Sequence, residues 1–270
     1  MSISVLVPTP VEAENIESPA RESVAVLLPT YCEAENIERL IHEIQGLKLN
    51  VRIVVIDDSS PDGTADMVSK LDEKYGNIVL ISRPEKLGLG TAITDGFRYM
   101  LALRKAPDYI VTMDSDYSHN PQDIPKLVDI AKKGYALVIG SRYIQGGKMK
   151  NWPLKRRLIS RFANIMATAV VGARLHDCTS GFRCYSEQYV KDVLPNLHSQ
   201  TYEIQIETIR QAHLNKFAVK EIPIAFIDRK NGKSKLATAE VQGFLIYLVK
   251  TTFNRLFSAK PKTSSTRSGK

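Results

Sequence analysis

Two carboxylates one residue apart, Asp114 and Asp116, directly follow the apolar run 109–113. A buried strand tolerates charge only at its ends, so we expect both acids at the carboxyl edge of a sheet, where open α/β sheets bind ligands. Mg²⁺ or Mn²⁺ commonly binds through one or two carboxylates plus substrate phosphates, so the pair predicts such a metal site. The alternative is an acidic turn before a helix, because Asn120 and Pro121 are typical of an N-cap and a first helical position.

Further polar and aromatic side chains follow the first two predicted strands. Pro29, Tyr31 and Glu33 come after the first strand, and Asp57 comes after the second. A carboxylate at such a switch point commonly meets a ribose hydroxyl, so Asp57 is a candidate nucleotide ligand. Its alternative role is to cap the turn that follows, although other polar residues of that turn could do so.

Basic or glycine-containing stretches also lie near predicted strand ends. The glycine-bearing loop 83–92 opens a helix, which by itself is a weak sign of a phosphate loop. Arg142 follows the fifth strand, and segment 151–157 places the only Trp beside a basic cluster, which could equally be a solvated helix start. The basic loop 228–235 contains a glycine and could fold over a pyrophosphate and neutralise it.

Composition limits the classes of function. The 270 residues carry a formal net charge of +8, and 43% of them are hydrophobic, as in an ordinary globular protein with an anionic partner. Much of the basic excess lies at 148–161 and from 250 onward, which suits a phosphorylated ligand or an anionic membrane surface. The sequence shows no basic face with interspersed aromatic residues, which would have indicated binding of nucleic acid. No apolar run is long enough to span a bilayer, no signal-peptide profile is visible, and three scattered cysteines fit a cytoplasmic setting.

Short apolar strands must alternate with helices to position these groups. We predict strands at 24–28, 52–56, 78–82, 108–113, 136–140 and 218–227, and helices at 34–45, 64–74, 89–104, 121–133, 153–173, 186–195, 201–214 and 237–257. This alternation predicts an α/β, Rossmann-like single domain whose mostly parallel sheet has helices on both faces. Helix 34–45 should turn one apolar face to the sheet, formed by Ile37, Leu40, Ile41 and Ile44.

The chain begins with an internal duplication. Residues 5–17 recur at 26–38 with ten of thirteen positions identical, which a local duplication explains better than a repeat architecture. Ser18 and Pro19 should stop a helix after the first copy. We therefore expect residues 1–22 to be an accessory extension, residues 23–258 to be the catalytic domain, and the polar, basic residues 259–270 to be a disordered tail.

Taken in order, the motifs resemble those of the dolichol-phosphate mannosyltransferases, in the large inverting glycosyltransferase family with the GT-A fold. The resemblance covers about residues 24–257. The two acidic motifs identify the broad family, whereas segments 86–92, 179–183 and 228–236 are typical of its polyprenyl-phosphate branch. Two positions depart from the family pattern, since Cys32 stands where Asn is common and Ser59 where Gly is common.

The resemblance implies roles for individual residues. The GDP part of GDP-mannose would be held by Pro29, Tyr31, Glu33, the backbone of Val55, Asp57 and Ser115. The metal and the pyrophosphate would be bound by Asp114 and Asp116, with Ser118 near the same ion. The acceptor phosphate would meet Arg142 and Arg156, and the donor pyrophosphate Arg229 and Lys235. Asp116 and these four basic residues would be the catalytic set.

The resemblance further implies transfer of mannose from GDP-mannose to dolichyl or another polyprenyl phosphate, with inversion and with Mg²⁺ or Mn²⁺ as cofactor. The alternatives are a dolichyl-phosphate glucosyltransferase that uses UDP-glucose, and a non-catalytic nucleotide or lipid-phosphate binder. Such an enzyme would be peripheral on the cytosolic face of the endoplasmic reticulum or, in a prokaryote, of the plasma membrane. Helix 237–257 could be its interfacial helix or a docking face for a small membrane subunit, or it could simply pack on the domain.

Overall fold

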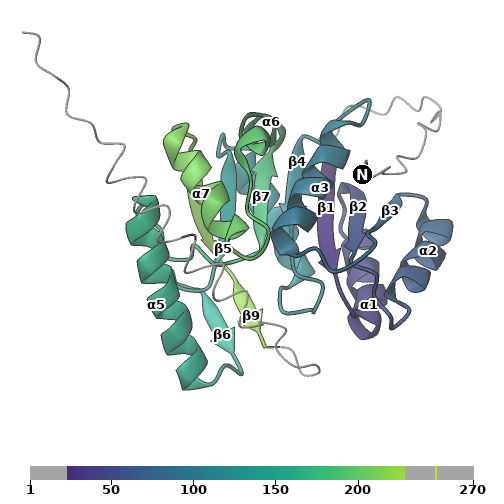
Figure 1. Cartoon of the computed structure of the whole chain (residues 1–270), viewed down its shortest axis with the longest axis horizontal. Helices are drawn as coiled ribbons and strands as arrows, with labels where there is room; N and C mark the ends of the chain where they lie inside the picture. Colours follow the sequence, from purple (N-terminus) through teal and green to yellow (C-terminus); the bar gives the residue numbers. More distant parts are fainter. Residues whose placement is uncertain (1–22, 229–246, 248–270) are drawn as a thin grey trace, which may run out of the picture.

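The computed structural model describes residues 23–228 and 247, and its centre is a seven-stranded, mostly parallel sheet (Figure 1). Among the described strands of this sheet, only β7 runs antiparallel to its neighbours. The predicted α/β class with a mostly parallel sheet is therefore confirmed. In spatial order the strands are β3 (Ile78–Ser82), β2 (Asn50–Asp57), β1 (Ser23–Thr30), β4 (Tyr109–Thr112), β7 (Arg183–Ser186), β5 (Leu137–Ser141) and β8 (Val219–Pro223).

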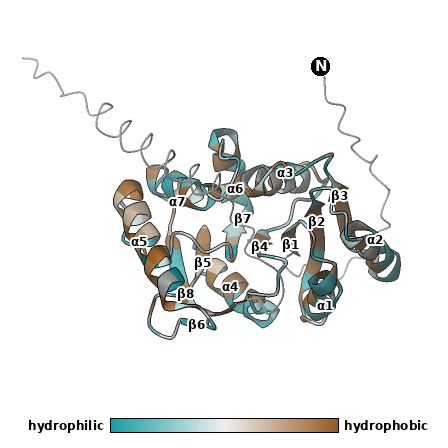
Figure 2. Ribbon diagram, turned by 60° about the horizontal axis from the view of Figure 1, so that its bottom comes forward, coloured by the Kyte–Doolittle hydropathy of each residue, from teal (hydrophilic) through white to brown (hydrophobic). Residues whose placement is uncertain are grey.

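Helices cover both faces of the sheet, as predicted (Figure 2). Successive side chains of β1 point to opposite faces, so this strand contributes to two cores. Val24 and Val26 belong to the core shared with α1 (Ala34–Gln45), α2 (Thr64–Tyr75) and α4 (Ile124–Ala131). Ala25 and Leu27 belong to the core shared with α3 (Leu89–Leu101), α5 (Leu154–Val171), α6 (Glu187–Val193) and α7 (Ile204–Leu214). The four predicted apolar residues of α1 are all buried.

The strands differ from the prediction at two places. Segment 218–227 was expected as one strand, but β8 ends at Pro223 and β9 (Ala225–Ile227) pairs with β6 (Lys148–Lys150) in a separate two-stranded sheet. Between them, Ile224 donates its N–H to Ser141 and accepts from Lys148, so the chain crosses from one sheet to the other. Strand β7 was not predicted, because four residues are too few to show a period.

The helix after the acid pair begins with a turn of 3₁₀ helix (Pro121–Asp123) that leads into α4, so the predicted helix 121–133 is shorter than expected. Asn120 caps this turn by accepting the N–H of Gln122 at 3.1 Å, which confirms the expected cap. The predicted extension 1–22 and tail 259–270 lie outside the described residues, as does helix 237–257 apart from residue 247. Within the described ranges no helix has both the length and the hydropathy needed to cross a bilayer.

Candidate active site

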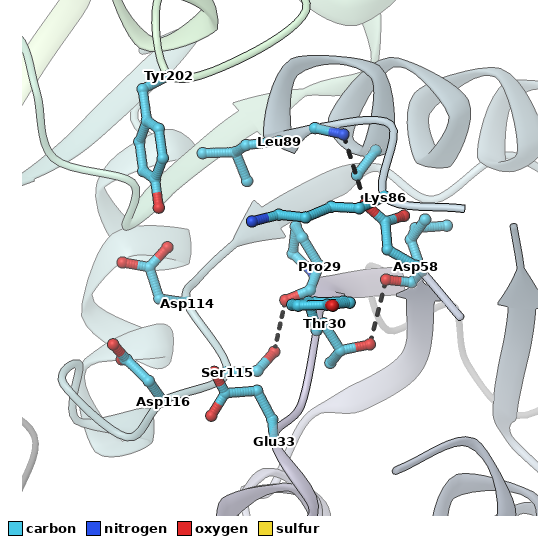
Figure 3. Close-up of a pocket in the computed structure, with 14 residues that line it drawn as sticks. Pro29, Thr30, Glu33, Asp58, Lys86, Leu89, Asp114, Ser115, Asp116 and Tyr202 are labelled. Atoms are coloured by element: carbon cyan, nitrogen blue, oxygen red, sulfur yellow. Dashed lines mark hydrogen bonds between the residues drawn. The ribbon is translucent and has the colours of Figure 1, made fainter. Parts of the chain in front are cut away.

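The ends of β1 and β4 lie side by side and open into one pocket (Figure 3). The two strands are parallel neighbours with Leu27 opposite Thr112, so the residues after each strand meet at the carboxyl edge of the sheet. The structure thus brings together most of the predicted donor-binding residues. The pocket is lined by Pro29, Thr30, Tyr31, Glu33, Ile56, Asp58, Lys86, Gly88, Leu89, Ala92, Asp114, Ser115, Asp116 and Tyr202.

The predicted acid pair lies on the loop after β4, and both carboxylates face the pocket (Figure 3). The side chain of Asp114 is 38% exposed. The carboxylate of Asp116 accepts the N–H of Ser118 at 3.0 Å, which fixes its orientation. The hydroxyl of Ser115 donates to the carbonyl of Pro29 at 3.0 Å and so ties the acidic loop to the end of β1.

A buried histidine supports the acid pair from behind. His119 stacks on Phe182 with ring centroids 5.1 Å apart, and its Nδ1 lies 3.3 Å from the backbone nitrogen of Asp114. Burial lowers the pKa of His119 to about 4, against the opposing effect of the Asp116 charge. The imidazole is therefore neutral near pH 7, and its Nδ1 can accept the Asp114 N–H.

The donor set of this loop fits a hard divalent cation. Within the described residues no group of three or more His, Cys, Asp or Glu side chains gathers around one point, so this part of the chain offers the ion a pair of carboxylates. Mg²⁺ and its analogues often bind in this way and take their other ligands from water and substrate phosphates. Ser118 does not line the pocket, and its buried hydroxyl has no hydrogen-bond partner within the described ranges, so direct ligation by Ser118 stays a prediction.

Asp57 is the last residue of β2 and does not line the pocket. Its carboxylate accepts the N–H of Ser60 at 2.9 Å and the hydroxyls of Ser60 and Thr30 at 2.6 and 3.1 Å, and the residue is only 1% exposed. With these contacts Asp57 caps the turn that follows β2, which is the alternative role that the sequence left open for it. Val55 is fully buried in β2, and no atom of it lines the pocket. The predicted contacts of Asp57 and Val55 with a nucleotide stay predictions.

The next acid, Asp58, organises the glycine-bearing loop. Its Oδ1 accepts from Nε of Arg83 at 2.6 Å, and its Oδ2 accepts the N–H groups of Leu87 and Gly88 at 3.2 and 3.4 Å. Burial raises the pKa of Asp58, although the charge of Arg83 acts in the opposite direction. Because these amides already have partners, the structure does not support a phosphate loop built from them.

The same loop positions an aromatic residue from a distant segment. The N–H groups of Gly90 and Thr91 donate to the carbonyl of Gln200 at 2.9 and 3.3 Å. A Cβ on Gly90 would lie 2.3 Å from the carbonyl oxygen of Ser199, so only glycine permits this close approach. The docked segment carries Tyr202 to the rim of the pocket (Figure 3).

Three residues beside the site adopt a left-handed backbone although they are not glycine. Cys32, Ser59 and Tyr117 have φ values of 55°, 53° and 62°. Each follows directly on a pocket residue, so the chain turns sharply where it leaves the pocket. Asn and Gly tolerate this conformation best, which explains why the family pattern has them where this chain has Cys32 and Ser59.

Arg142 follows β5 and is held by an acid that the sequence did not single out. Nε and Nη2 of Arg142 each lie 2.7 Å from one carboxylate oxygen of Asp177, and Nη2 also donates to Thr179 at 2.7 Å. The guanidinium carbon lies 5.5 Å from the ring centroids of both Trp152 and Phe226. Arg142 is only 8% exposed, so any ligand would meet it at one edge.

Arg156 stands on the first turn of α5. Its Nη1 lies 2.8 and 2.9 Å from the carboxylate oxygens of Asp228, and its guanidinium lies 4.6 Å from the ring centroid of Trp152. Its side chain is 39% exposed. Arg229 and Lys235, the predicted pyrophosphate residues, follow Asp228 in the chain and lie outside the described residues.

Two pocket residues were missed as ligand candidates. Lys86 belongs to the glycine-bearing loop, and its Nζ lies 5.0 Å from the ring centroid of Tyr31, above the pocket (Figure 3). The position of Lys86 beside a glycine turn could have marked it as a ligand candidate in the sequence. Nothing in the sequence marked Tyr202, because only the docking of segment 199–202 on α3 places it at the pocket.

The fold and the acid pair at the sheet edge define a glycosyltransferase, and the comparison with known families agrees. The chain belongs to glycosyl transferase family 2, whose family model matches residues 25–194. It is 36% identical over 194 residues to polyprenol monophosphomannose synthase of Mycolicibacterium smegmatis, covering 71% of this chain and 72% of the relative. It is 37% identical over 187 residues to undecaprenyl-phosphate mannosyltransferase of Micrococcus luteus, covering 68% of this chain and 75% of the relative.

Solved structures show the same fold at low sequence identity. Glucosyl-3-phosphoglycerate synthase from Mycobacterium tuberculosis, solved with Mn²⁺, UDP and glucosyl-3-phosphoglycerate, aligns with a TM-score of 0.62 at 18% identity, covering 87% of this chain and 80% of that one. The mannosyltransferase PcManGT from Pyrobaculum calidifontis, solved with GDP-Man and Mn²⁺, aligns with a TM-score of 0.56 at 16% identity, covering 90% of this chain and 66% of that one.

Proposed function

We propose that this protein transfers mannose from GDP-mannose to dolichyl or another polyprenyl phosphate, with inversion at the anomeric carbon. The names of the two relatives support mannosyl transfer to a polyprenyl phosphate, and the GDP-Man complex of PcManGT supports the donor. The observation that carries the proposal is the shared pocket, in which Tyr31 and Glu33 from the end of β1 meet Asp114 and Asp116 from the end of β4.

The donor is proposed to lie along this pocket from β1 to β4. Pro29, Tyr31 and Glu33 would contact the guanosine, with Val55 and Asp57 behind them, and Ser115 would hold the acidic loop in place. A Mg²⁺ or Mn²⁺ ion bound by Asp114 and Asp116 would neutralise negative charge on the departing diphosphate. Arg229 and Lys235, from the loop after Asp228, are proposed to add positive charge to the same group.

The acceptor needs no general base. A phosphate monoester has its second pKa near 6, so close to pH 7 an anionic oxygen is already available. This oxygen forms the new bond to the anomeric carbon while the bond from that carbon to the GDP oxygen breaks, and GDP leaves with the electron pair. The protein must offset repulsion between two anionic substrates, which is the role proposed for Arg142 and Arg156.

Arg142 is built for this task because its orientation is fixed. Asp177 and Thr179 engage Nε and Nη2, so the guanidinium cannot rotate and its Nη1 edge is assigned to the acceptor phosphate. Asp177 also neutralises Arg142 in the absence of ligand, so burial of the guanidinium is tolerated. Arg156 is more exposed and would meet the phosphate first.

A donor panel tests the proposal. The full-length protein is incubated with a polyprenyl phosphate, Mg²⁺ or Mn²⁺, and GDP-mannose, UDP-glucose or another nucleotide sugar, and the lipid product is identified by mass spectrometry. We expect mannosyl polyprenyl phosphate from GDP-mannose only, with a β anomeric signal in NMR. Glucosyl product from UDP-glucose would favour the glucosyltransferase alternative, and absence of any product would favour a binding protein.

A further inference from the structure

Tyr117, the residue directly after the acid pair, has a left-handed backbone with a φ of 62°. A bulky residue takes this conformation only where the surrounding structure holds it there. The hydrogen bond that orients Asp116 spans this residue, since the N–H of Ser118 donates to the Asp116 carboxylate at 3.0 Å. A change of backbone conformation at Tyr117 would therefore break this bond and release the side chain of Asp116.

The ring of Tyr117 is held from the side of helix α1. Tyr117 does not line the pocket, and its side chain packs instead on the core cluster that contains the apolar face of α1. The guanidinium carbon of Arg39, near the middle of α1, lies 4.4 Å from the centroid of the ring. A cation over an aromatic face at this distance is attracted by the ring. Arg39 therefore fastens the loop of the acid pair to α1.

A carboxylate on the same helix completes this contact. Glu43 lies one turn after Arg39, and its Oε1 is 3.2 Å from Nε of Arg39. Burial raises the pKa of Tyr117 to about 12, and the nearby Glu43 carboxylate adds to this effect while the charge of Arg39 opposes it. Both charged side chains thus lie beside the phenol. We call Arg39 and Glu43 the α1 clamp.

Helix α1 is a rigid support for this clamp, because its four apolar residues are fully buried. The helix begins directly after Glu33, which lines the pocket and accepts from Nδ2 of Asn36 at 3.0 Å. Glu33 and Asp116 therefore reach the pocket from two segments that are both attached to α1 (Figure 3). This one helix sets the position of the acidic loop relative to the rest of the pocket.

We propose that Tyr117, held by the α1 clamp, is a positioning residue that fixes the orientation of the Asp116 carboxylate before any ligand binds. Partners that orient a metal ligand from behind commonly change metal affinity about 10–100-fold when they are lost. The consequence for a divalent cation rests on the proposed function, whereas the positioning itself is a property of the protein alone. The two can therefore be tested separately.

Hydrogen exchange tests the positioning without any ligand. The Ser118 amide, which donates to Asp116, is followed by NMR in the full-length protein, and it can exchange only when the loop opens. Tyr117→Ala and Arg39→Met should each speed its exchange at least about threefold, because both remove the contact between ring and cation. Tyr117→Phe keeps the ring and should stay within about twofold of wild type. Unchanged exchange in Tyr117→Ala and Arg39→Met would overturn the proposal.

Metal affinity provides the second arm. Full-length protein saturated with GDP is titrated with Mn²⁺, and the free ion is measured by electron paramagnetic resonance. The Kd for Mn²⁺ should rise about tenfold in Tyr117→Ala and about threefold in Arg39→Met, with Arg39→Lys closer to wild type because the cation is retained. The Kd for GDP without metal should not change, since neither residue lines the pocket. Equal loss of GDP and Mn²⁺ affinity would indicate general damage and would discard the positioning role.

The variants at Arg39 keep the test valid if Tyr117→Ala does not fold, because the Arg39 side chain is 72% exposed and its replacement should leave thermal unfolding unchanged. The matched control is Arg104→Met, an exposed arginine beyond the end of α3 on the other face of the sheet, which should match wild type in every measurement.

The two arms separate this inference from the proposed function. If wild type with GDP binds no Mn²⁺ although Arg39→Met speeds exchange at Ser118, the metal role in the proposed function fails and the positioning role stands. If wild type binds Mn²⁺ and the variants change neither exchange nor affinity, the positioning role fails and the proposed function stands.

Discussion

Arg142 and Asp177 form a buried, bidentate ion pair beside the active site, with two nitrogen–oxygen distances of 2.7 Å. Their side chains are 7% and 0% exposed. The pair joins the end of β5 to the segment before β7, and the N–H of Arg142 adds a further bond to Asp177 at 2.9 Å. A guanidinium fixed in this way can present a defined edge to a phosphate, so the pair links the stability of the fold to the proposed chemistry.

Removal of both partners of this ion pair should lower the free energy of unfolding by less than the two single removals added together. Arg142→Met leaves a buried carboxylate without its cation and should lower the free energy of unfolding by about 3–5 kcal/mol. Arg142→Met with Asp177→Asn should cost clearly less than the sum of the single variants, because no uncompensated charge remains. Urea unfolding of the four proteins measures this coupling. Additive costs would show that the two groups stabilise the fold independently.

Acid should weaken the fold partly through Asp177. Burial by itself would raise the pKa of Asp177, but Arg142 outweighs it and holds the pKa below the ordinary value of 3.8. For a carboxyl with a lowered folded-state pKa, the stabilisation is present above the unfolded-state pKa and is lost as pH falls through the folded-state pKa. Unfolding free energies measured from pH 5 downward should therefore fall less steeply below pH 3.8 in Asp177→Asn than in wild type. Parallel curves would contradict this.

The acid pair should be needed for turnover and not for folding. Asp116→Ala should reduce mannosyl transfer by about a hundredfold or more, because charge on the leaving diphosphate is no longer offset. Its melting temperature should stay near that of wild type, since Asp116 lies in the pocket and outside the core clusters. Asp129→Ala, an exposed acid on α4, is the matched control and should remain active. Near-normal turnover of Asp116→Ala, or of wild type in excess EDTA, would refute the metal assignment.

The close approach at Gly90 should control the position of Tyr202. Gly90→Ala would place a Cβ 2.3 Å from the carbonyl oxygen of Ser199, so segment 199–202 must move and the fold should lose about 1–3 kcal/mol. The same shift should raise KM for the donor more than it lowers kcat. At Gly46 an added Cβ would lie no closer than 3.4 Å to another atom, so Gly46→Ala should change neither the stability of the fold nor the KM for the donor. An unchanged donor KM in a destabilised Gly90→Ala protein would separate Tyr202 from donor binding.

The first copy of the duplicated segment should be dispensable. Pro10 stands where the second copy has Tyr31, so residues 1–22 lack a pocket aromatic and should add nothing to the chemistry. A protein that begins at residue 23 should fold and should turn over within a few-fold of wild type, measured by thermal unfolding and donor kinetics. Failure of the shortened chain to fold would show that the first copy belongs to the domain.

Local sequence determined the elements and the edge at which the chemistry lies. Alternating apolar strands and helices gave the α/β class, and the position of Asp114 and Asp116 directly after an apolar run placed both at the carboxyl end of β4. Such features depend on side-chain period and on the cost of burying charge, which act within a few residues of the chain.

Tertiary structure alone decided which partners these groups meet. Asp177 finds Arg142, and Tyr202 reaches the pocket, through contacts between segments far apart in the chain, which no local period records. The short strand β7 exists because β4 and β5 offer it hydrogen bonds on both sides. The sequence likewise did not determine which side of α5 meets the core, because periodicity shows that a helix is amphipathic but packing decides which side is buried.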